Sequence, residues 1–428
     1  METKKVYDIL GIGIGPFNLG LAALCNDIRG LDCMFFDEKP SFDWHPGLLL
    51  QSAKMQVPFY ADLVTPVDPT SRFSFMNFLH AKKRMFRFAI LEDNFPLRTE
   101  YVEYCKWAAA QLPSLHFGYR CEAIHFDEQE KLYKITIRNS EPGNPQLHTF
   151  CIRAKNIVIG IGSTPYIPEY ALPLISENCI HASEYLFHKE HLFTKKSISV
   201  IGSGQSGAEV FYDLLQSSEQ FESLNWYTSS AEFFPMDYSK FALEMATPEY
   251  TEHFYSLPVE TKTAILKNQN HLYKGINASL ISDIYTLLYN KSLKGNTNVL
   301  VQSNMKLECI GKKESEFQLQ FRHRQSGKKL LASSDAIIIS TGYVNRAAPF
   351  LAPIKELVSW EEGNVYKVNK NYSVDKSNSI FVQNADLYSH GFNSADLGLG
   401  PHRNAAILNS ILKREHFVIE KGNPFQKF

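Results

Sequence analysis

The chain lacks both an excess of one charge and any long apolar run. Its 428 residues carry 44 lysines and arginines against 45 aspartates and glutamates, a formal net charge of -1. Nucleic-acid binding usually needs a clustered basic surface, and a membrane-spanning helix needs about 20 successive apolar residues. The sequence has neither pattern, so we expect no nucleic-acid partner and no membrane association. Because residues 1–5 lead directly into a strand without the apolar region of a signal peptide, we expect a cytoplasmic protein.

Cysteine pairs at short spacing are absent as well. The seven cysteines are scattered, odd in number and never arranged as CxxC. Dithiol redox centres and many zinc sites depend on such pairs. A thioredoxin-reductase-like enzyme is therefore excluded, and we expect no bound metal.

What the sequence does contain is an apolar strand that breaks at a glycine-rich turn and continues as a helix, YDILGIGIGPFNL at 7–19. Gly13 and Gly15 let the backbone turn tightly and approach a pyrophosphate, while the helix from Pro16 offers unpaired N–H groups. About 20 residues later a second strand ends at Asp37, whose carboxylate suits the ribose hydroxyls of a dinucleotide. This pattern predicts a first site for FAD or NAD.

A second copy of the pattern, SISVIGSGQSGAE, occupies 197–209 with its glycines at Gly202 and Gly204. The strand that follows, 224–227, ends at Thr228 without an acidic residue. An uncharged end tolerates a 2′-phosphate, so the second site favours NADPH, although the sequence identifies no arginine for that phosphate. Two nucleotide sites in one chain indicate hydride transfer between them.

Two further apolar segments that break at glycine, 157–165 and 336–343, flank the second copy. Together the segments predict an α/β protein with two Rossmann-like dinucleotide-binding domains, the NADPH domain being inserted in a discontinuous FAD domain. We expect the first part of the FAD domain at 1–195, the NADPH domain at 196–300 and the second part of the FAD domain at 301–428. Elements of the substrate site are expected at the domain junction.

The ordered motifs resemble the flavin-dependent N-hydroxylating monooxygenases of siderophore biosynthesis, the lysine/ornithine N-monooxygenase-like family, and within it the diamine and histamine branch. The resemblance covers nearly the whole chain and rests on GPFNL at 15–19, WHPGLLL at 44–50, MQ at 55–56, DPTSRFSF at 68–75, Arg98, GSGQS at 202–206 and STGY at 340–343. It implies that NADPH reduces FAD, that the reduced flavin activates O2, and that one oxygen atom passes to a substrate amine. Homo-oligomers are usual for this family, so we expect one here.

The resemblance also implies roles for individual residues. Gln56 would lie near the reacting amine, Arg98 close to the flavin, and Asn277 against substrate or nicotinamide. The residues expected to bind the cofactors are Gly13, Gly15, Pro16, Asn18, Asp37, Trp44, His45, Met55, Gly202, Gly204, Gln205, Ser206, Thr341 and Gly342. Taken without the resemblance, core packing is the preferred interpretation of Met55 and a surface ion pair that of Arg98.

Two departures from the family pattern concern the far end of the substrate. Ala61 stands where the ornithine and lysine hydroxylases carry a lysine that pairs with the substrate carboxylate, and Leu243 stands where they carry an asparagine. A hydrogen bond to a charged group contributes roughly 1.5–3 kcal/mol, so both losses disfavour an amino acid. We therefore expect a small primary amine without an α-carboxylate, such as putrescine, cadaverine or histamine, in a pocket formed by Ala61, Leu243, Gln56 and Asn277.

Three alternatives follow from the same residues. Lys54 or Lys240 could supply the missing cation, which would make L-ornithine N5- or L-lysine N6-hydroxylation the activity. A noncatalytic flavin-binding module would keep the glycine turns without oxidising NADPH. A Baeyer–Villiger monooxygenase requires FxGxxxH before the second turn. Counting back from His181 gives Glu177 and Ile175 instead of glycine and phenylalanine, so the sequence does not fit this third alternative.

Overall fold

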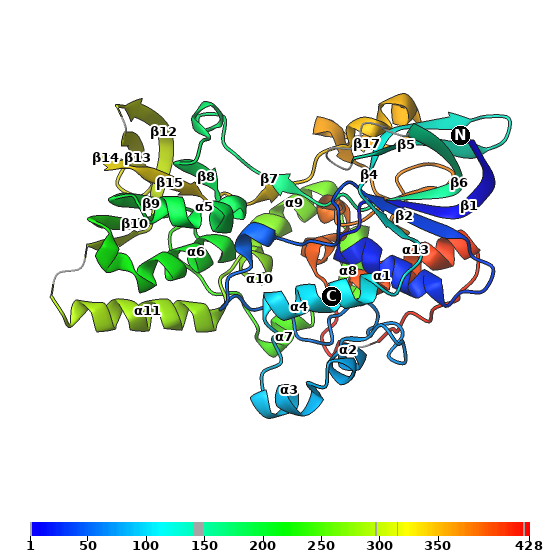
Figure 1. Cartoon of the computed structure of the whole chain (residues 1–428), viewed down its shortest axis with the longest axis horizontal. Coiled ribbons are helices and arrows are strands. Elements are labelled where there is room, and N and C mark those ends of the chain that lie inside the picture. Colours follow the sequence, from blue (N-terminus) through cyan, green and yellow to red (C-terminus); the bar gives the residue numbers. More distant parts are fainter. Residues whose placement is uncertain (1, 141–148, 296–297, 315, 423) are drawn as a thin grey trace.

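Two β-sheets organise the chain, one toward each end of the molecule (Figure 1). The computed structural model describes residues 2–140, 149–295, 298–314, 316–422 and 424–428. Each sheet is built around a parallel core in which one strand runs into one of the two glycine turns. The predicted α/β class is therefore visible in the sheet topology itself.

The first sheet contains both parallel and antiparallel strands, in the order β3-β2-β1-β6-β5-β4 with β19 also paired to β6. Its strands are β1 (Glu2–Ile12), β2 (Cys33–Asp37), β3 (Leu115–Phe117), β4 (Tyr119–Asp127), β5 (Leu132–Asn139), β6 (Thr149–Ile159) and β19 (Ile380–Val382). The long β6 pairs in parallel with β1 and β19 and antiparallel with β5. Helix α1 (Pro16–Asn26) packs on α4 (Arg98–Ala109) and α13 (Gly400–Leu412), while η5 (Pro349–Leu357) packs on β4.

The second sheet is wholly parallel, in the order β11-β10-β9-β15-β8. Its strands are β8 (Cys179–His181), β9 (Ser197–Ile201), β10 (Ser223–Tyr227), β11 (Val299–Gln302) and β15 (Ala336–Ile339). One face packs on α5 (Tyr185–Leu192), α6 (Gln205–Gln216) and α11 (Ala278–Ser292), and the other on the antiparallel strands β12 (Met305–Lys313), β13 (Glu316–His323) and β14 (Lys329–Ser334). Along β9, Val200 faces the helices and Ile201 faces the antiparallel strands, as the two-residue period of a strand requires.

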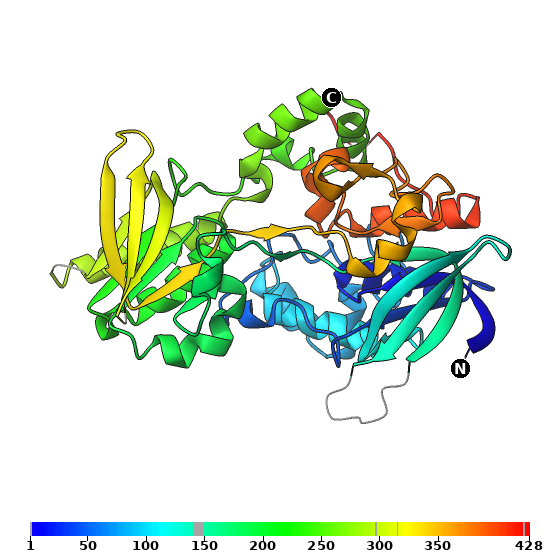
Figure 2. The ribbon, with the colours of Figure 1, turned by 90° about the horizontal axis from the view of Figure 1, so that it is seen from above.

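We call the first sheet with its helices the first unit, and the second sheet with its helices and antiparallel strands the second unit. A pair of short antiparallel strands joins them, β7 (Thr164–Pro165) and β16 (Tyr343–Val344). Figure 2 shows these connections crossing between the units near the middle of the molecule. The expected range 196–300 does not enclose the second sheet, because β9 takes β15 as its neighbour and β15 in turn takes β8. We therefore propose that the inserted unit extends from about 166 to 342.

A helical excursion leaves the second unit between β10 and α11 and packs against the end of the chain (Figure 1). It consists of α7 (Lys240–Leu243), α8 (Pro248–Ser256), α9 (Val259–Asn268) and α10 (Asn270–Tyr273), and α8 and α9 contact α12 (Leu387–His390). Buried Tyr250 and Leu272 join Phe392 of η7 (Phe392–Ala395) in a small apolar cluster. This contact closes the junction between the units on one side.

The remaining elements are short and lie in connections. They are η1 (Pro46–Leu48), α2 (Phe75–Ala81), α3 (Met85–Leu91), η2 (Leu172–Leu174), η3 (Ala182–Glu184), η4 (Ser218–Gln220), β17 (Trp360–Glu361), η6 (Glu362–Asn364) and β18 (Val365–Tyr366). Within the described ranges, no helix combines the length and apolar character that crossing a membrane demands. The same residues form no cluster of three or more histidine, cysteine or acidic side chains suited to a metal ion.

Candidate functional site

The first glycine turn is held by Asn18, the residue that stands in place of a third glycine. Gly13 has φ +85°, and a Cβ there would stand 2.5 Å from the carbonyl oxygen of Gly160. The buried Asn18 amide donates to the Gly13 carbonyl at 2.8 Å and reaches the end of β6 through Val158. The asparagine therefore ties the turn to the neighbouring strand, and its amide leaves no room for a side chain at Gly160.

The beginning of α1 provides the features that an FAD pyrophosphate and ribose need. Gly15 is the N-cap with open space beside it, no side chain caps the helix, and Pro16 starts the first turn. The Asp37 carboxylate is buried at the end of β2 and accepts hydrogen bonds from the N–H groups of Ile14 at 2.7 Å and Lys39 at 2.9 Å. The N–H groups in the first turn of α1, which no side chain caps, and the acid next to the turn fit FAD.

The second turn repeats this geometry at the start of α6. Gly202 has φ +125°, and a Cβ there would stand 2.1 Å from the carbonyl oxygen of Ser340. Gly204 is the N-cap, with open space and no side-chain cap, and Ser206 lies half-buried in the first helical turn. The arrangement fits a second dinucleotide.

Arg324 lies at the end of β10, where the second dinucleotide would place its ribose. It follows β13, and its guanidinium donates to the carbonyl oxygen of Ser229 at 3.2 Å. The neighbouring Thr228 hydroxyl donates to Ser203 in the glycine turn at 2.8 Å. Sequence reasoning missed this arginine, because only folding of the antiparallel strands over the second sheet brings it to residue 229. An exposed arginine beside an uncharged strand end fits the 2′-phosphate of NADPH.

Trp44 and His45 form an aromatic group near the crossing between the units. The His45 ring lies 4.7 Å from Trp44 and 5.8 Å from Tyr343, centroid to centroid. Burial, with smaller contributions from the positive charges of Arg98 and Lys39, lowers the pKa of His45 to about 4. The imidazole is therefore neutral at physiological pH.

Thr341 and Gly342 lie where the chain returns from the second unit. The Thr341 hydroxyl donates to the carbonyl oxygen of Tyr166 at 2.5 Å, and Gly342 has φ +85°. His181 lies within 3.2 Å of the Gly342 carbonyl oxygen through Nε2. Both predicted cofactor residues therefore lie at the crossing, next to the start of β16.

Arg98 forms a buried ion pair between the two units. Its guanidinium makes two hydrogen bonds to the Glu209 carboxylate on α6, at 2.9 and 2.7 Å, and a third to the carbonyl oxygen of Leu48 at 2.8 Å. Arg98 is 9% exposed and Glu209 is 4% exposed. Arg98 thus does form an ion pair, but the alternative prediction that this pair lies on the surface is wrong, because it is buried between α4 and α6.

A hydrogen-bonded chain continues from this ion pair to the residues expected around the substrate. The Gln205 amide donates to Glu209 at 2.8 Å and accepts from the N–H of Asn277 at 2.8 Å. The Tyr238 hydroxyl lies 3.0 Å from Oδ1 of Asn277 and 3.2 Å from the carbonyl oxygen of Gln56. Burial raises the pKa of Tyr238 to about 12, so its phenol keeps its proton. Sequence reasoning missed Glu209 and Tyr238, the two connecting residues.

Met55 and Gln56 lie on the first-unit side of this chain. Met55 is buried in the core around the first sheet, and its N–H donates to the carbonyl oxygen of Pro96 at 2.9 Å. The Gln56 amide donates to the carbonyl oxygen of Gly275 at 3.3 Å, in the segment that leads to Asn277. Gln56 and Asn277, predicted from separate parts of the sequence, are thus brought together.

The predicted far end of the pocket has a buried Ala61 and a partly exposed Leu243. Ala61 is 3% exposed, while Leu243, at the end of α7, is 42% exposed. The Lys54 ammonium pairs with Asp93 at 2.6 Å, and Lys240 is exposed at the start of α7. In the described part of the chain, the alternative cation at Lys54 is thus already paired with an acid.

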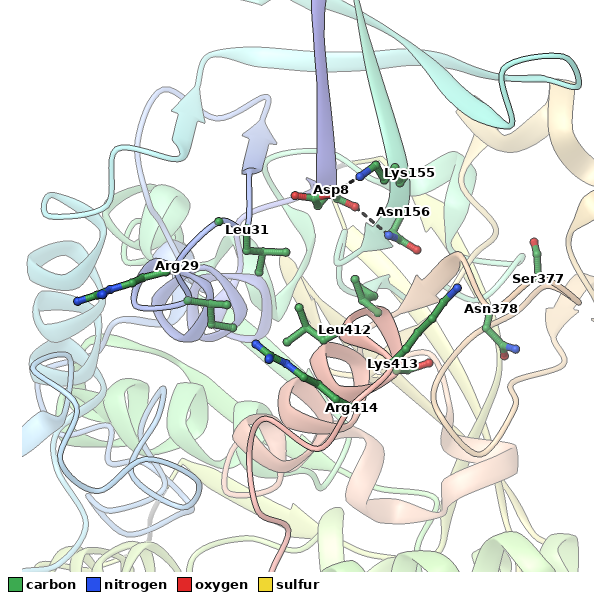
Figure 3. Close-up of a pocket in the computed structure, with 14 residues that line it drawn as sticks. Asp8, Arg29, Leu31, Lys155, Asn156, Ser377, Asn378, Leu412, Lys413 and Arg414 are labelled. Atoms are coloured by element: carbon green, nitrogen blue, oxygen red, sulfur yellow. Dashed lines mark hydrogen bonds and ion pairs between the residues drawn. The ribbon is translucent and has the colours of Figure 1, made fainter.

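A cavity of about 420 Å³ lies away from these residues, between the C-terminal ends of α1 and α13 (Figure 3). The Asp8 carboxylate on its wall pairs with Lys155 at 2.8 Å, and the Asp8 carbonyl accepts from Asn156 at 2.9 Å. None of the predicted site residues lines it. A much narrower recess does reach the first glycine turn, lined by Pro16, Phe17, Asp62, Leu63, Tyr101, Leu397, Gly400, Pro401 and Asn404.

Comparisons with known proteins agree with this geometry. A family model described as L-lysine 6-monooxygenase/L-ornithine 5-monooxygenase matches residues 5–345. The putrescine N-hydroxylase of Shewanella oneidensis is 41% identical over 426 residues, which are 99% of this chain and 84% of that protein.

Two solved structures are similar along almost their whole length. The FAD-bound cadaverine monooxygenase of the desferrioxamine pathway of Erwinia amylovora has a TM-score of 0.96 and 40% identity, covering 99% of both chains. The ornithine N-hydroxylase of Kutzneria sp. 744, with reduced FAD, NADP+ and L-ornithine, has a TM-score of 0.87 and 25% identity, covering 96% of this chain and 99% of that one. The predicted family, the fold class and the cofactors FAD and NADPH are confirmed.

Proposed function

We propose that this chain, which belongs to the L-lysine 6-monooxygenase/L-ornithine 5-monooxygenase family, N-hydroxylates a small primary amine without an α-carboxylate. The preferred candidates are putrescine and cadaverine, with histamine as a third, in the biosynthesis of a siderophore. The observation that carries this choice is Ala61, a buried methyl group at the position where a carboxylate-binding lysine is expected.

The first unit would hold FAD at the Gly13 turn and Asp37, and the second would hold NADPH at the Gly202 turn, α6 and Arg324. When bound, these cofactors supply the electrons and the activated oxygen for the reaction. The residues of the chain bind and orient both cofactors across the junction that the Arg98–Glu209 pair spans. Enclosure of that pair keeps water from the contact between the units.

The residues around the predicted amine position suit a neutral nitrogen. An amine attacks only when it is unprotonated, and its ordinary pKa is about 10.4. Gln56, Tyr238 and Asn277 are uncharged, and Tyr238 stays protonated because burial raises its pKa to about 12. Uncharged neighbours of this kind do not stabilise the protonated form of an enclosed amine, and the Gln56 and Asn277 amides can orient it.

L-Ornithine or L-lysine hydroxylation is the second candidate, because the family includes both activities. An enclosed α-carboxylate would need a cation, and each lost hydrogen bond to that charge would cost roughly 1.5–3 kcal/mol. Lys54 is bound to Asp93 and would have to break that ion pair to take part. We therefore place the amino acids second.

A screen of putrescine, cadaverine, histamine, L-ornithine and L-lysine tests the proposal. Hydroxylated amine is measured separately from NADPH oxidation and from hydrogen peroxide, because uncoupled turnover consumes NADPH without product. We expect product from the diamines and a kcat/KM at least about 100-fold lower for the amino acids. Efficient hydroxylation of L-ornithine or L-lysine alone would contradict the proposal. If no amine supports NADPH oxidation by the FAD-loaded protein, the noncatalytic module is correct instead.

The homo-oligomeric state and the cytoplasmic location stay predictions from the sequence. Size-exclusion chromatography with light scattering tests the first, and fractionation of the producing cells tests the second. A monomer at micromolar concentration would contradict the expected oligomer.

A further inference from the structure

The carboxylate of Asp396 lies near the predicted substrate pocket without a basic partner. Asp396 follows η7 and precedes α13, and its Oδ1 accepts a hydrogen bond from the N–H of Gly398 at 2.7 Å. Among the described residues, no lysine, arginine or histidine nitrogen forms an ion pair with it within 4.0 Å. The positive charge of Arg403 acts on Asp396 without forming an ion pair, and the Arg403 guanidinium lies over the rings of Phe17 and Tyr372.

Asp396 and Ala61 lie on the same side of Gly398. A Cβ built on this glycine would stand 3.1 Å from Oδ1 of Asp396 and 3.4 Å from the Cβ of Ala61. The small size of both Gly398 and Ala61 thus leaves the carboxylate beside the position where the family pattern would put a lysine. At this end of the pocket a cation is missing and an anion is present.

Asp396 also belongs to the same region as the residues expected around the reacting amine. Its charge is close enough to Tyr238 to raise the pKa of that phenol, and Tyr238 contacts both Gln56 and Asn277. Asp396 keeps part of its surface accessible, yet desolvation raises the pKa of its own carboxyl group. A half-buried carboxylate of this kind attracts a cation more strongly than a carboxylate in bulk water does.

The neighbouring Asp62 does not offer the same opportunity. Its two oxygens accept hydrogen bonds from the N–H groups of Val64, Thr65 and Phe75 and from the Thr65 hydroxyl, at 2.7–2.9 Å. This carboxylate is therefore used to hold its own loop. Asp396 is half-buried and has fewer donors around it, the N–H groups of Gly398 and Leu399.

We propose that Asp396 binds the distal ammonium of an aliphatic diamine and thereby selects diamines over monoamines and amino acids. This inference rests on the proposed function and names the substrate class of the same site. Asp396 would repel an α-carboxylate, so it adds to the effect of the missing lysine. The imidazole of histamine is mostly neutral above pH 7, so histamine gains less from this contact.

The test compares putrescine with 1-aminobutane, which has the same carbon chain and no second amine. In Asp396→Asn we expect the KM for putrescine to rise about 10- to 100-fold, and the KM for 1-aminobutane to change less than about 3-fold. The control is Asp237→Asn, which removes an equal charge next to Tyr238 from a half-buried carboxylate that accepts a hydrogen bond from the N–H of Ser239. The control should leave both KM values unchanged. FAD content and the rate at which NADPH reduces the bound flavin report on folding.

The outcomes separate the two proposals. If the wild-type protein hydroxylates none of putrescine, cadaverine and histamine, the proposed function fails and this inference fails with it. If the wild-type protein hydroxylates putrescine and Asp396→Asn keeps its preference over 1-aminobutane, the inference alone is overturned. Should the variant fail to fold, the wild-type protein still decides, because equal KM values for putrescine and 1-aminobutane would overturn the role of Asp396.

Discussion

Removing the Glu209 carboxylate should destabilise the protein far more than removing an exposed acid. Glu209→Ala leaves the Arg98 guanidinium buried with the Leu48 carbonyl as its only hydrogen-bond acceptor among the described residues. Breaking a buried ion pair by deleting one partner typically costs about 3–5 kcal/mol, because the other charge stays desolvated. Gln205 also loses its bond to Glu209, so the N-terminal turn of α6 is affected.

The matched control is Glu219→Ala, which removes the partner of Lys291 from an ion pair in which Glu219 is 69% exposed. An exposed pair of this kind contributes less than about 1 kcal/mol. Urea unfolding followed by circular dichroism and by tryptophan fluorescence measures both variants, since the two signals reveal whether the units unfold together. The affinity for NADPH is measured in parallel, and we expect only Glu209→Ala to weaken it.

The reasoning is refuted if Glu209→Ala lowers the unfolding free energy by no more than Glu219→Ala does. That result would mean that Arg98 finds another partner or water when its acid is removed. A second variant, Arg98→Met combined with Glu209→Met, tests the same idea in reverse. Because both buried charges are removed together, the double variant should recover much of the unfolding free energy that Glu209→Ala loses.

Three other changes have defined results. Arg324→Ala should raise the KM for NADPH about 10-fold or more and leave the KM for NADH unchanged. The control is Arg322→Ala, which removes a side chain that pairs with Glu308 and should change neither KM. Equal effects on both nucleotides would argue against a 2′-phosphate contact. Gly13→Ala should abolish FAD retention, because the new Cβ would clash with the carbonyl oxygen of Gly160. Its control, Gly30→Ala, lies at φ +80° with open space and should lower the free energy of unfolding by only about 1–2 kcal/mol and retain FAD. Retention of FAD in both variants would show that the turn relaxes. The pKa of His45 is lowered to about 4 in the folded chain. Below pH 6.5 the unfolded chain therefore binds a proton that the folded chain does not bind. As a result, the free energy of unfolding falls by up to about 3 kcal/mol between pH 6.5 and pH 4. His45→Asn should flatten this slope in urea titrations at several pH values, and an unchanged slope would assign it to other groups.

The two nucleotide turns could be predicted from the sequence because all their parts are close together in the chain. Gly13, Gly15 and Asp37 belong to one strand–turn–helix–strand segment, and the structure keeps them in contact through the bond from Ile14 to Asp37. The family and the loss of the lysine at Ala61 were also readable, since both depend on residue identity at fixed spacing. The domain boundaries at 196 and 300 stay predictions, and local patterns are a poor guide to them because parallel strands take neighbours from distant parts of the chain.

The sequence by itself determined the two dinucleotide folds, the family and the presence of alanine instead of lysine at position 61. Only the tertiary structure decided which side chains meet across the junction: Arg98 and Glu209 are 111 residues apart, Tyr238 and Gln56 are 182 apart, and Arg324 and Ser229 are 95 apart. Asp396 likewise comes beside Ala61 only because the segment before α13 folds back onto the first unit. Local patterns fix strands, turns and helices, whereas contacts between side chains far apart in the chain depend on how those elements pack.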